Sequence, residues 1–294
     1  MHQDRPFLVW FLFVVLTMLW GCSYFLMKKG MEVYSPLMIA SVRIASAGLL
    51  MLPWSVYHLT RVPKNKVLVL ILSGFFGNGI PAVLFCLALK GLDTNLGGIL
   101  NALTPIWVLA IGILFFNKKT TLRKALGVMI GFAGICILFL SKGKISTHNI
   151  ELSLYIVVAT MLYGLNINLA EAYLGDVPSL YIGTVSILAV GIIYTVLIYV
   201  GIDASWAQVS YQLIQWNEPH IYYGIALGVL NTALSNILFY ELVKIGSASF
   251  ASMVTYIMPF VTIIIALFIG ETIMWESLIC LGMILTGVYM VRRG

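Results

Sequence analysis

Ten long apolar runs follow one another along this 294-residue chain, each about the length of a helix that crosses a lipid bilayer. They lie near residues 7–27, 34–56, 67–89, 94–116, 122–141, 151–173, 178–200, 220–243, 247–270 and 274–291. The chain is 61% apolar and 10% charged, whereas soluble domains are roughly 45–50% apolar and about 25% charged. The runs are continuous and lack the period-two alternation of membrane barrel strands. The sequence therefore predicts an all-α integral membrane protein with ten transmembrane helices.

The basic residues indicate how the chain is inserted. Because ten is an even number of spans, both termini lie on one side, and that side carries eleven of the 17 Lys and Arg residues. The other side carries five, and Arg43 lies inside the second run. Basic residues are retained in the cytoplasm, so both termini are predicted to be cytoplasmic in a multi-pass protein of the cell (inner) membrane. The net charge of +6 then reports orientation, and no nucleic-acid partner is expected.

The second half of the sequence repeats the first. Residues 14–21, VVLTMLWG, match residues 157–164, VVATMLYG, at an offset of 143. Further along, Gly74 matches Gly228 and Pro105 matches Pro259 at an offset of 154, because the connection between the seventh and eighth runs is longer. The chain is therefore expected to contain two five-helix repeats, residues 1–145 and 146–294.

Five is an odd number of spans, so the second repeat enters the bilayer from the face opposite to the first. Inverted-topology repeats are typical of secondary transporters, which bind their solute near the bilayer midplane where the two halves meet. Two inverted halves can close the pathway at either face by nearly equivalent motions. The repeat therefore predicts alternating access around a central cavity.

Short motifs in both halves resemble the EamA family of the drug/metabolite transporter superfamily. They are Leu19-Trp20-Gly21, Pro36, Arg43, Pro105, Tyr240 with Pro259, and Glu271 followed by a glycine-rich last span. The resemblance covers nearly the whole chain and implies ten helices, cytoplasmic termini and a central cavity used to move small metabolites out of the cell. The family often has Glu at the end of the fourth span, where this chain has Asn117. A role for that Glu in both halves is therefore not expected here.

Arg43 is the most unusual polar residue within the spans. It lies nine residues into the second run, where an arginine costs ~2.5–3.5 kcal/mol on insertion scales. The guanidinium therefore needs a partner. One reading is a carboxylate or phosphate of a solute, or a gating ion pair; the other is a structural bond to carbonyls or a carboxylate of a neighbouring helix. The sequence leaves both open.

Other polar residues within the spans are candidates for lining the cavity, because hydrocarbon offers them no partner. Glycines and a proline surround Asn78 in the third span. The eighth span, which occupies the equivalent place in the second repeat, carries Asn231 and Ser235 on one helix face. Polar-tipped aromatic residues suit amphipathic organic solutes better than bare ions, although any one of these side chains can instead serve in helix packing. The substrate-binding candidates are Trp20, Tyr24, Arg43, Asn78, Asn101, Tyr163, Asn166, Asn231, Ser235, Asn236, Tyr240 and Tyr256.

Neither a cofactor nor a metal site is expected. The four histidines lie near span ends or in loops, and the chain has no phosphate-binding loop of the ATPase type. All eleven acidic residues lie in loops or toward span ends, which favours facilitated movement, exchange or weak proton coupling. We expect a secondary transporter that exports small organic metabolites, amino acids and related compounds among them. Two other classes stay open, a polytopic membrane enzyme acting on a lipid or isoprenoid substrate, and a channel.

The expected partners are a small-molecule substrate and the lipid bilayer. Gly127, Gly131 and Gly134 permit close helix contact in the fifth span, either within a monomer or between the subunits of a homodimer. The polar connection 201–219 carries Trp206 and Trp216, and its spacing suits either an interfacial helix or an aromatic loop.

Overall fold

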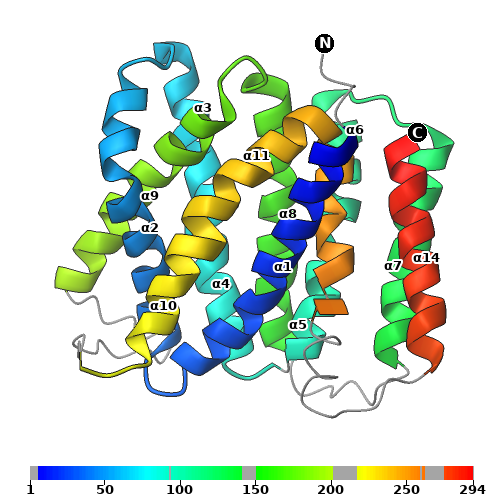
Figure 1. The fold of residues 1–294 in the computed structure, drawn as a ribbon, viewed down its shortest axis with the longest axis horizontal. Helices are drawn as coiled ribbons and strands as arrows, with labels where there is room; N and C mark the ends of the chain where they lie inside the picture. The colour runs from blue at the N-terminus through cyan, green and yellow to red at the C-terminus, as the bar shows by residue number, and fades with distance from the viewer. Residues whose placement is uncertain are drawn as a thin grey trace.

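The computed structural model describes residues 6–92, 94–140, 150–200, 217–258, 260–261 and 275–293. Within these ranges the chain forms helices joined by short turns and no β-strand, which confirms the all-α prediction for the described residues (Figure 1). The first half contains α1 (Pro6–Gly30), α2 (Pro36–Leu59), α3 (Lys64–Gly74), the π-helix η1 (Phe75–Gly79), α4 (Ile80–Leu89), α5 (Thr94–Asn101), α6 (Thr104–Phe116) and α7 (Leu122–Leu140). The second half contains α8 (Ile150–Tyr173), α9 (Ser179–Val200), α10 (Ile221–Gly228), the π-helix η4 (Val229–Leu234), α11 (Ser235–Gly246), α12 (Ala248–Ser252) and α14 (Trp275–Arg293).

Six helical runs are long and apolar enough to cross a membrane. They are Pro6–Gly30, Pro36–Leu59, Lys64–Leu89, Ile150–Tyr173, Ser179–Tyr199 and Ile221–Gly246. Two shorter apolar helices, Thr104–Phe116 and Ala248–Met258, lie within the fourth and ninth expected spans, and α7 and α14 lie at the fifth and tenth. Helices thus occur at each of the ten expected positions, and the crossing of the bilayer by all ten stays a prediction.

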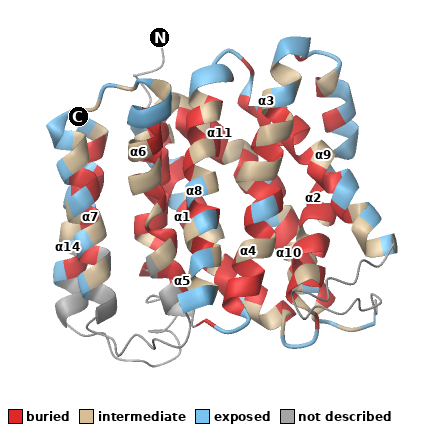
Figure 2. Ribbon diagram, turned by 180° about the vertical axis from the view of Figure 1, so that it is seen from behind, coloured by how far each residue is buried: buried red, intermediate tan, exposed pale blue. Residues whose placement is uncertain are grey.

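The outer surface of the bundle carries large apolar side chains. Leu68, Leu114 and Leu49 expose 65, 72 and 57% of their surface. Figure 2 shows the buried residues concentrated between the helices and the exposed ones on outward sides. Extended apolar surface of this kind is unfavourable in water, so the outer faces are suited to lipid.

The fourth expected span is divided into two helices. Pro105 has no backbone N–H and disfavours helical geometry in the residue before it. The chain turns between α5 and α6, and α6 then starts with Pro105 in its first turn. At its other end Asn117 adopts a left-handed conformation with φ 49°, which Asn tolerates better than most residues. Asn117 thus ends α6.

Two π-helices interrupt the third and eighth spans at matching positions. η1 begins at Phe75 and η4 begins at Val229, which is the repeat offset of 154. Pro81 lies just after η1 and cannot donate a backbone hydrogen bond. The Tyr194 hydroxyl donates to the Gly79 carbonyl at 2.9 Å and so satisfies a group in this irregular stretch. Both spans are therefore interrupted by π-turns at equivalent positions, and π-turns often occur at functional sites.

Two helix pairs at opposite sides of the bundle join the halves of the chain (Figure 1). In the first pair, α2 packs along α9, with Gly48 against Gly191 and the His58 ring stacked on Tyr181 at 4.2 Å. Residue numbers rise along one helix as they fall along the other, so the two run antiparallel. In the second pair, α7 packs along α14. The expected close contact of Gly127, Gly131 and Gly134 occurs within the chain, against α14 and Tyr256.

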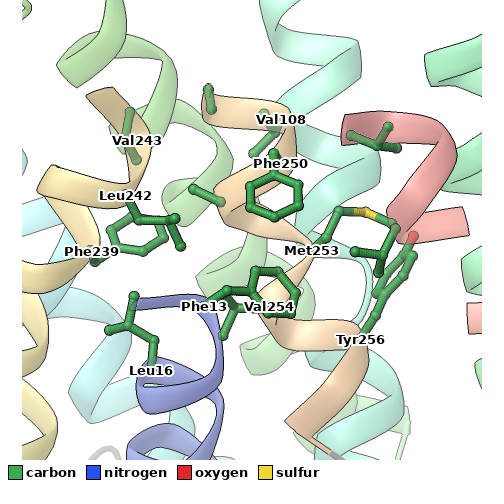
Figure 3. Close-up of a cluster of buried hydrophobic side chains, with 14 of the residues drawn as sticks. Phe13, Leu16, Val108, Phe239, Leu242, Val243, Phe250, Met253, Val254 and Tyr256 are labelled. Atoms are coloured by element: carbon green, nitrogen blue, oxygen red, sulfur yellow. The ribbon is translucent and has the colours of Figure 1, made fainter. Parts of the chain in front are cut away.

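One of the two large apolar cores lies between α1, α11, α12 and α14. Figure 3 shows Phe13 and Leu16 of α1 facing Phe239 and Leu242 of α11, with Phe250 of α12 beside them. The Phe13 and Phe250 rings lie 5.0 Å apart. This core joins the first helix of the chain to the second half, so the two halves fold into one bundle.

Candidate functional site

A cavity lies among the middle turns of the helices, between the two halves of the chain. It holds about 790 Å³ of space, its open side included. The wall is formed by α1, α2, η1, α4, α5 and α6 from the first half and by α8, η4, α11, α12 and residues 255–258 from the second. The lining residues are Trp20, Ser23, Tyr24, Met27, Arg43, Gly77, Asn78, Phe85, Asn101, Thr104, Tyr163, Asn166, Ile167, Asn231, Thr232, Asn236, Phe239, Ser252, Thr255 and Met258.

Most of this lining consists of pairs of residues that the sequence repeat relates. Sixteen of the twenty residues pair with another lining residue at the offset of 143 or 154. The pairs are Trp20 with Tyr163, Ser23 with Asn166, Tyr24 with Ile167, Gly77 with Asn231, Asn78 with Thr232, Phe85 with Phe239, Asn101 with Thr255, and Thr104 with Met258. Both repeats therefore contribute matching surfaces to one chamber. Met27, Arg43, Asn236 and Ser252 are the lining residues outside this pairing.

Arg43 brings a positive charge into the cavity. Its Nε donates to the Thr232 hydroxyl at 2.8 Å, and its Nη1 lies 4.0 Å from the Met27 sulfur. Within the described part of the chain no carboxylate lies within 4.0 Å of the guanidinium, and no lining residue is acidic. The hydrogen bond to Thr232 joins two helical segments, but it does not neutralise the positive charge, which has no counter-ion among the described residues.

The amide side chains of the cavity mainly join helices to one another. Asn78 Nδ2 donates to Asn236 Oδ1 at 3.3 Å, and Asn236 Nδ2 donates to the Ser186 hydroxyl at 3.2 Å. Asn231 Nδ2 donates to the Leu19 carbonyl. Asn166 Nδ2 donates to the Tyr240 hydroxyl at 3.2 Å. These bonds link α1 to η4, η1 and α9 to α11, and α8 to α11, so the amides hold the chamber together.

Aromatic rings and two tyrosine hydroxyls complete the wall. Trp20 packs against Phe239 at 5.1 Å, and Phe85 stacks on Tyr163 at 5.9 Å. The Tyr24 hydroxyl lies against Asn101, but it forms no hydrogen bond of normal geometry among the described residues. Both Tyr24 and Tyr163 lie within electrostatic reach of Arg43. The cavity thus combines an apolar aromatic face with a group of donors around one cation.

Nine of the twelve candidates predicted from the sequence line the cavity, and three lie outside it. The Ser235 hydroxyl donates to the Leu230 carbonyl at 2.8 Å, because the π-turn adds a residue and Asn236 takes the inward position instead. Tyr240 lies behind the wall, where it bonds to Asn166. The Tyr256 hydroxyl donates to the Val128 carbonyl at 2.9 Å within the apolar core.

Several lining residues were not among the sequence candidates. Ser23 and Phe85 are examples, and each matches a lining residue of the other half, Asn166 and Phe239. Applying the repeat offset to the candidate Asn166 identifies Ser23, whereas Phe239 was not itself a candidate, so the offset does not lead to Phe85. Met27 has no polar atom that hydrocarbon would disfavour, and no sequence signal marks it. Pro259, Glu271 and residues 201–216, which include Trp206 and Trp216, lie outside the described residues.

Polar contacts join the two halves at one end of the bundle, beyond the cavity. Lys66, at the start of α3, donates to the Asp176 carboxylate at 3.0 Å and to the Tyr173 carbonyl at 2.6 Å. The bond from Lys66 holds the pKa of Asp176 below its usual value. Lys118 pairs with Glu171 at the same end, and Glu171 also accepts from the Ala248 backbone N–H at 2.7 Å. Residues from both halves therefore meet on the side predicted to be cytoplasmic.

A matching contact lies at the opposite end of the bundle. His220, which is the repeat equivalent of Lys66 at the offset of 154, lies at the start of α10. Its Nε2 lies 3.5 Å from the Glu32 carboxylate, and its Nδ1 lies 2.5 Å from Glu218. The hydrogen bond from Lys29 lowers the pKa of Glu32, which keeps this carboxylate charged. Lys66 and His220, which occupy equivalent positions in the repeat, thus each contact the other half of the chain, at opposite ends of the bundle.

Known proteins are similar to this sequence over nearly its whole length. The EamA-like transporter family matches residues 8–140 and again residues 152–293. The uncharacterized transporter YvbV of Bacillus subtilis is 23% identical over 288 residues, covering 96% of this chain and 90% of the relative. The uncharacterized inner membrane transporter YedA of Escherichia coli K12 is 24% identical over 294 residues, covering 95% of this chain and 89% of the relative.

A solved structure shares the fold as well. It is titled "Crystal structure of protein", superposes with a TM-score of 0.71 at 13% identity, and the match covers 96% of each chain. The fold, the apolar helices and two family matches that together span nearly the whole sequence agree with one another. This chain belongs to the EamA-like transporter family and is a membrane transporter.

Proposed function

We propose that this chain is a secondary transporter that exports small organic metabolites, amino acids and related compounds among them, across the inner membrane. It works by alternating access between two inverted five-helix halves, residues 1–145 and 146–294. The observation that carries the proposal is the cavity lined by eight pairs of repeat-equivalent residues. A chamber built equally by both halves is what alternating access between them requires.

The packing of α2 against α9 supports an inverted relation between the halves. When two units are related by a two-fold axis in the membrane plane, a residue meets its own equivalent only on that axis. Gly48 and Gly191 are repeat equivalents, and they face each other where the two antiparallel helices cross. This contact supports a two-fold axis that relates the first half to the second in opposite orientations.

The contacts at the two ends of the bundle suit the two gates that alternating access needs. Lys66 and Asp176 join the halves at one end, and His220 and Glu32 join them at the other. Because Lys66 and His220 occupy equivalent positions, opening one end and closing the other are related motions of the same kind. The solute would then leave through the end whose contact is broken.

The driving force and direction rest on different grounds. No carboxylate lines the described cavity, which favours facilitated movement or exchange over strong proton coupling. Export and cytoplasmic termini are supported by the family resemblance and by the distribution of basic residues. The alternative of a lipid-modifying enzyme finds no support among the described residues, where no cluster of His, Cys, Asp and Glu suited to a metal was found.

Site-directed cross-linking tests the mechanism. In a variant lacking the four native cysteines, Lys66→Cys with Asp176→Cys closes one end, and Glu32→Cys with His220→Cys closes the other. We expect either cross-link to stop saturable flux in proteoliposomes and to block labelling of Asn101→Cys from the closed end only. Flux that continues through a cross-linked end would contradict alternating access.

The same variants test the inverted repeat. A membrane-impermeant maleimide is expected to label Lys66→Cys from the cytoplasmic face and His220→Cys from the opposite face. Labelling of both from one face would refute the inverted topology. An absence of saturable flux for every member of a broad metabolite panel would count against transport itself.

A further inference from the structure

We propose that Arg43 binds the carboxylate of the transported solute, so that the substrates are small organic carboxylates with an apolar part. This inference rests on the proposed transport function and names its substrate class. In the bound solute, the carboxylate lies at the guanidinium and the apolar part lies along the aromatic face of Trp20, Phe85 and Phe239. Three independent features of the cavity support it.

The first feature is the charge of the cavity. Arg43 carries the one formal charge among the lining residues, and no described carboxylate lies within 4.0 Å of it. A cation in a low-dielectric environment requires an anion or strong acceptors. The structure supplies one hydroxyl, that of Thr232, and one thioether, that of Met27. An anionic solute therefore supplies the counter-charge that the protein does not.

The second feature is the difference between the occupied and the unoccupied polar groups. The amides of Asn78, Asn166 and Asn231 are engaged in bonds between helices. By contrast, the hydroxyl of Tyr24, a residue with 4% of its surface exposed, has no hydrogen bond of normal geometry among the described residues. Tyr24 is one of the lining residues, and its hydroxyl is buried beside Asn101 within electrostatic reach of Arg43. The polar groups left for a solute are thus the guanidinium and this one hydroxyl, and both can donate to a carboxylate.

The third feature favours a carboxylate over a phosphate. Arg43 Nε is engaged with the Thr232 hydroxyl, and Nη1 contacts the Met27 sulfur, a weak acceptor, so neither Nη group has an oxygen acceptor among the described residues. A planar carboxylate can accept two parallel hydrogen bonds from a guanidinium. A phosphate monoester carries up to two negative charges, and no second cation lies among the described lining residues. A single negative charge therefore matches the site.

The repeat gives the cavity one such anchor only. The equivalent of Arg43 in the second half is Ser186, which accepts a hydrogen bond from Asn236 and does not line the cavity. The aromatic residues, by contrast, come from both halves. A solute is therefore held by its carboxylate at one wall, while its apolar part contacts a surface that both halves share.

Matched pairs of solutes test the proposal. The purified full-length chain in proteoliposomes is offered 3-phenylpropanoate, 4-methylpentanoate, phenylalanine and leucine, each beside its primary carboxamide, which keeps the shape and removes the negative charge. We expect saturable exchange of at least one carboxylate, with a half-saturation concentration at least tenfold below that of its carboxamide. Arg43→Gln is expected to bring this ratio close to one, and Arg43→Lys to give an intermediate value.

Two further variants keep the test independent of folding. Lys28→Gln also removes one positive charge from the first half but lies outside the cavity lining, so it should leave the ratio unchanged. Thr232→Val removes the hydrogen bond that orients Arg43 Nε and keeps the positive charge. It should therefore bring the ratio of the carboxamide and carboxylate half-saturation concentrations closer to one, and this test stands even if Arg43→Gln does not fold.

The outcomes separate the two proposals. Equal transport of carboxylates and carboxamides by the unaltered protein, or an unchanged ratio in a folded Arg43→Gln variant, overturns the role of Arg43 and leaves transport standing. An absence of saturable flux for every compound, carboxamides included, refutes the transport function and the substrate class together.

Discussion

The contact between Gly48 and Gly191 predicts a measurable loss of stability when a single methyl group is added. A Cβ at Gly48 would lie 2.6 Å from the Gly191 Cα, whereas carbon atoms in contact prefer ~3.5–4.0 Å. The clash is with backbone, so no side chain can rotate away, and α2 must move from α9 by roughly 1 Å. Overpacking of this kind costs about 1–3 kcal/mol. Gly48→Ala should therefore lower the folded-to-unfolded ratio by about five-fold to 150-fold.

Thermal unfolding of the purified protein in detergent, followed by tryptophan fluorescence, measures this loss. Gly191→Ala should cost a similar amount, because its Cβ would lie 2.7 Å from the Gly48 Cα. Gly282→Ala in α14 is the matched control, since a Cβ there would meet nothing within 4 Å. If Gly48→Ala and Gly282→Ala melt at the same temperature, the close approach of α2 and α9 is refuted.

Three further predictions concern the ends of the bundle and the wall of the cavity. Because Lys66 lowers the pKa of Asp176, this carboxylate stays charged as the pH falls toward the usual range of aspartic acid, and the ion pair is lost only at lower pH. The pair should therefore contribute equally to saturable flux at pH 7 and pH 5. Asp176→Asn should change the flux by the same factor at both pH values. His220→Ala removes the contact with Glu32 at the other end and should increase the labelling of a cavity cysteine from that end by several-fold. Unchanged labelling would show that this contact does not close the cavity. Tyr240→Phe removes the bond to Asn166 and should lower stability by about 0.5–1.5 kcal/mol, with a half-saturation concentration close to that of the unaltered protein; a large change in that value would place Tyr240 in the site.

The sequence predicts the positions of the helices well because hydrophobic length is a property of each segment alone. The repeat register goes further, since it relates Trp20 to Tyr163 and Asn101 to Thr255, and all four line the cavity. The details of the wall depend on local helix geometry, which this reasoning treats as ideal. An ideal helix places Ser235 beside Asn231, one turn away.

The π-turn explains why the prediction misses at that position. With one more residue in the turn, Asn236 and not Ser235 reaches the cavity, and Ser235 bonds to a backbone carbonyl of the same turn. Tyr240 and Tyr256 show a second limit. A polar atom in a span needs a partner, but the partner of each is a group of the protein, Asn166 or the Val128 carbonyl. Sequence alone does not distinguish a protein partner from a solute.

The unmatched arginine shows what a covalent link between two similar halves makes available. If each half were a separate, identical chain, any charge placed in the chamber would occur twice, and two guanidinium groups would repel each other across it. Joined in one polypeptide, the halves have diverged, so that Arg43 stands opposite Ser186 in the repeat. In the binding mode proposed above, a solute held at Arg43 would have a fixed head-to-tail direction and would keep it throughout its passage from one compartment to the other.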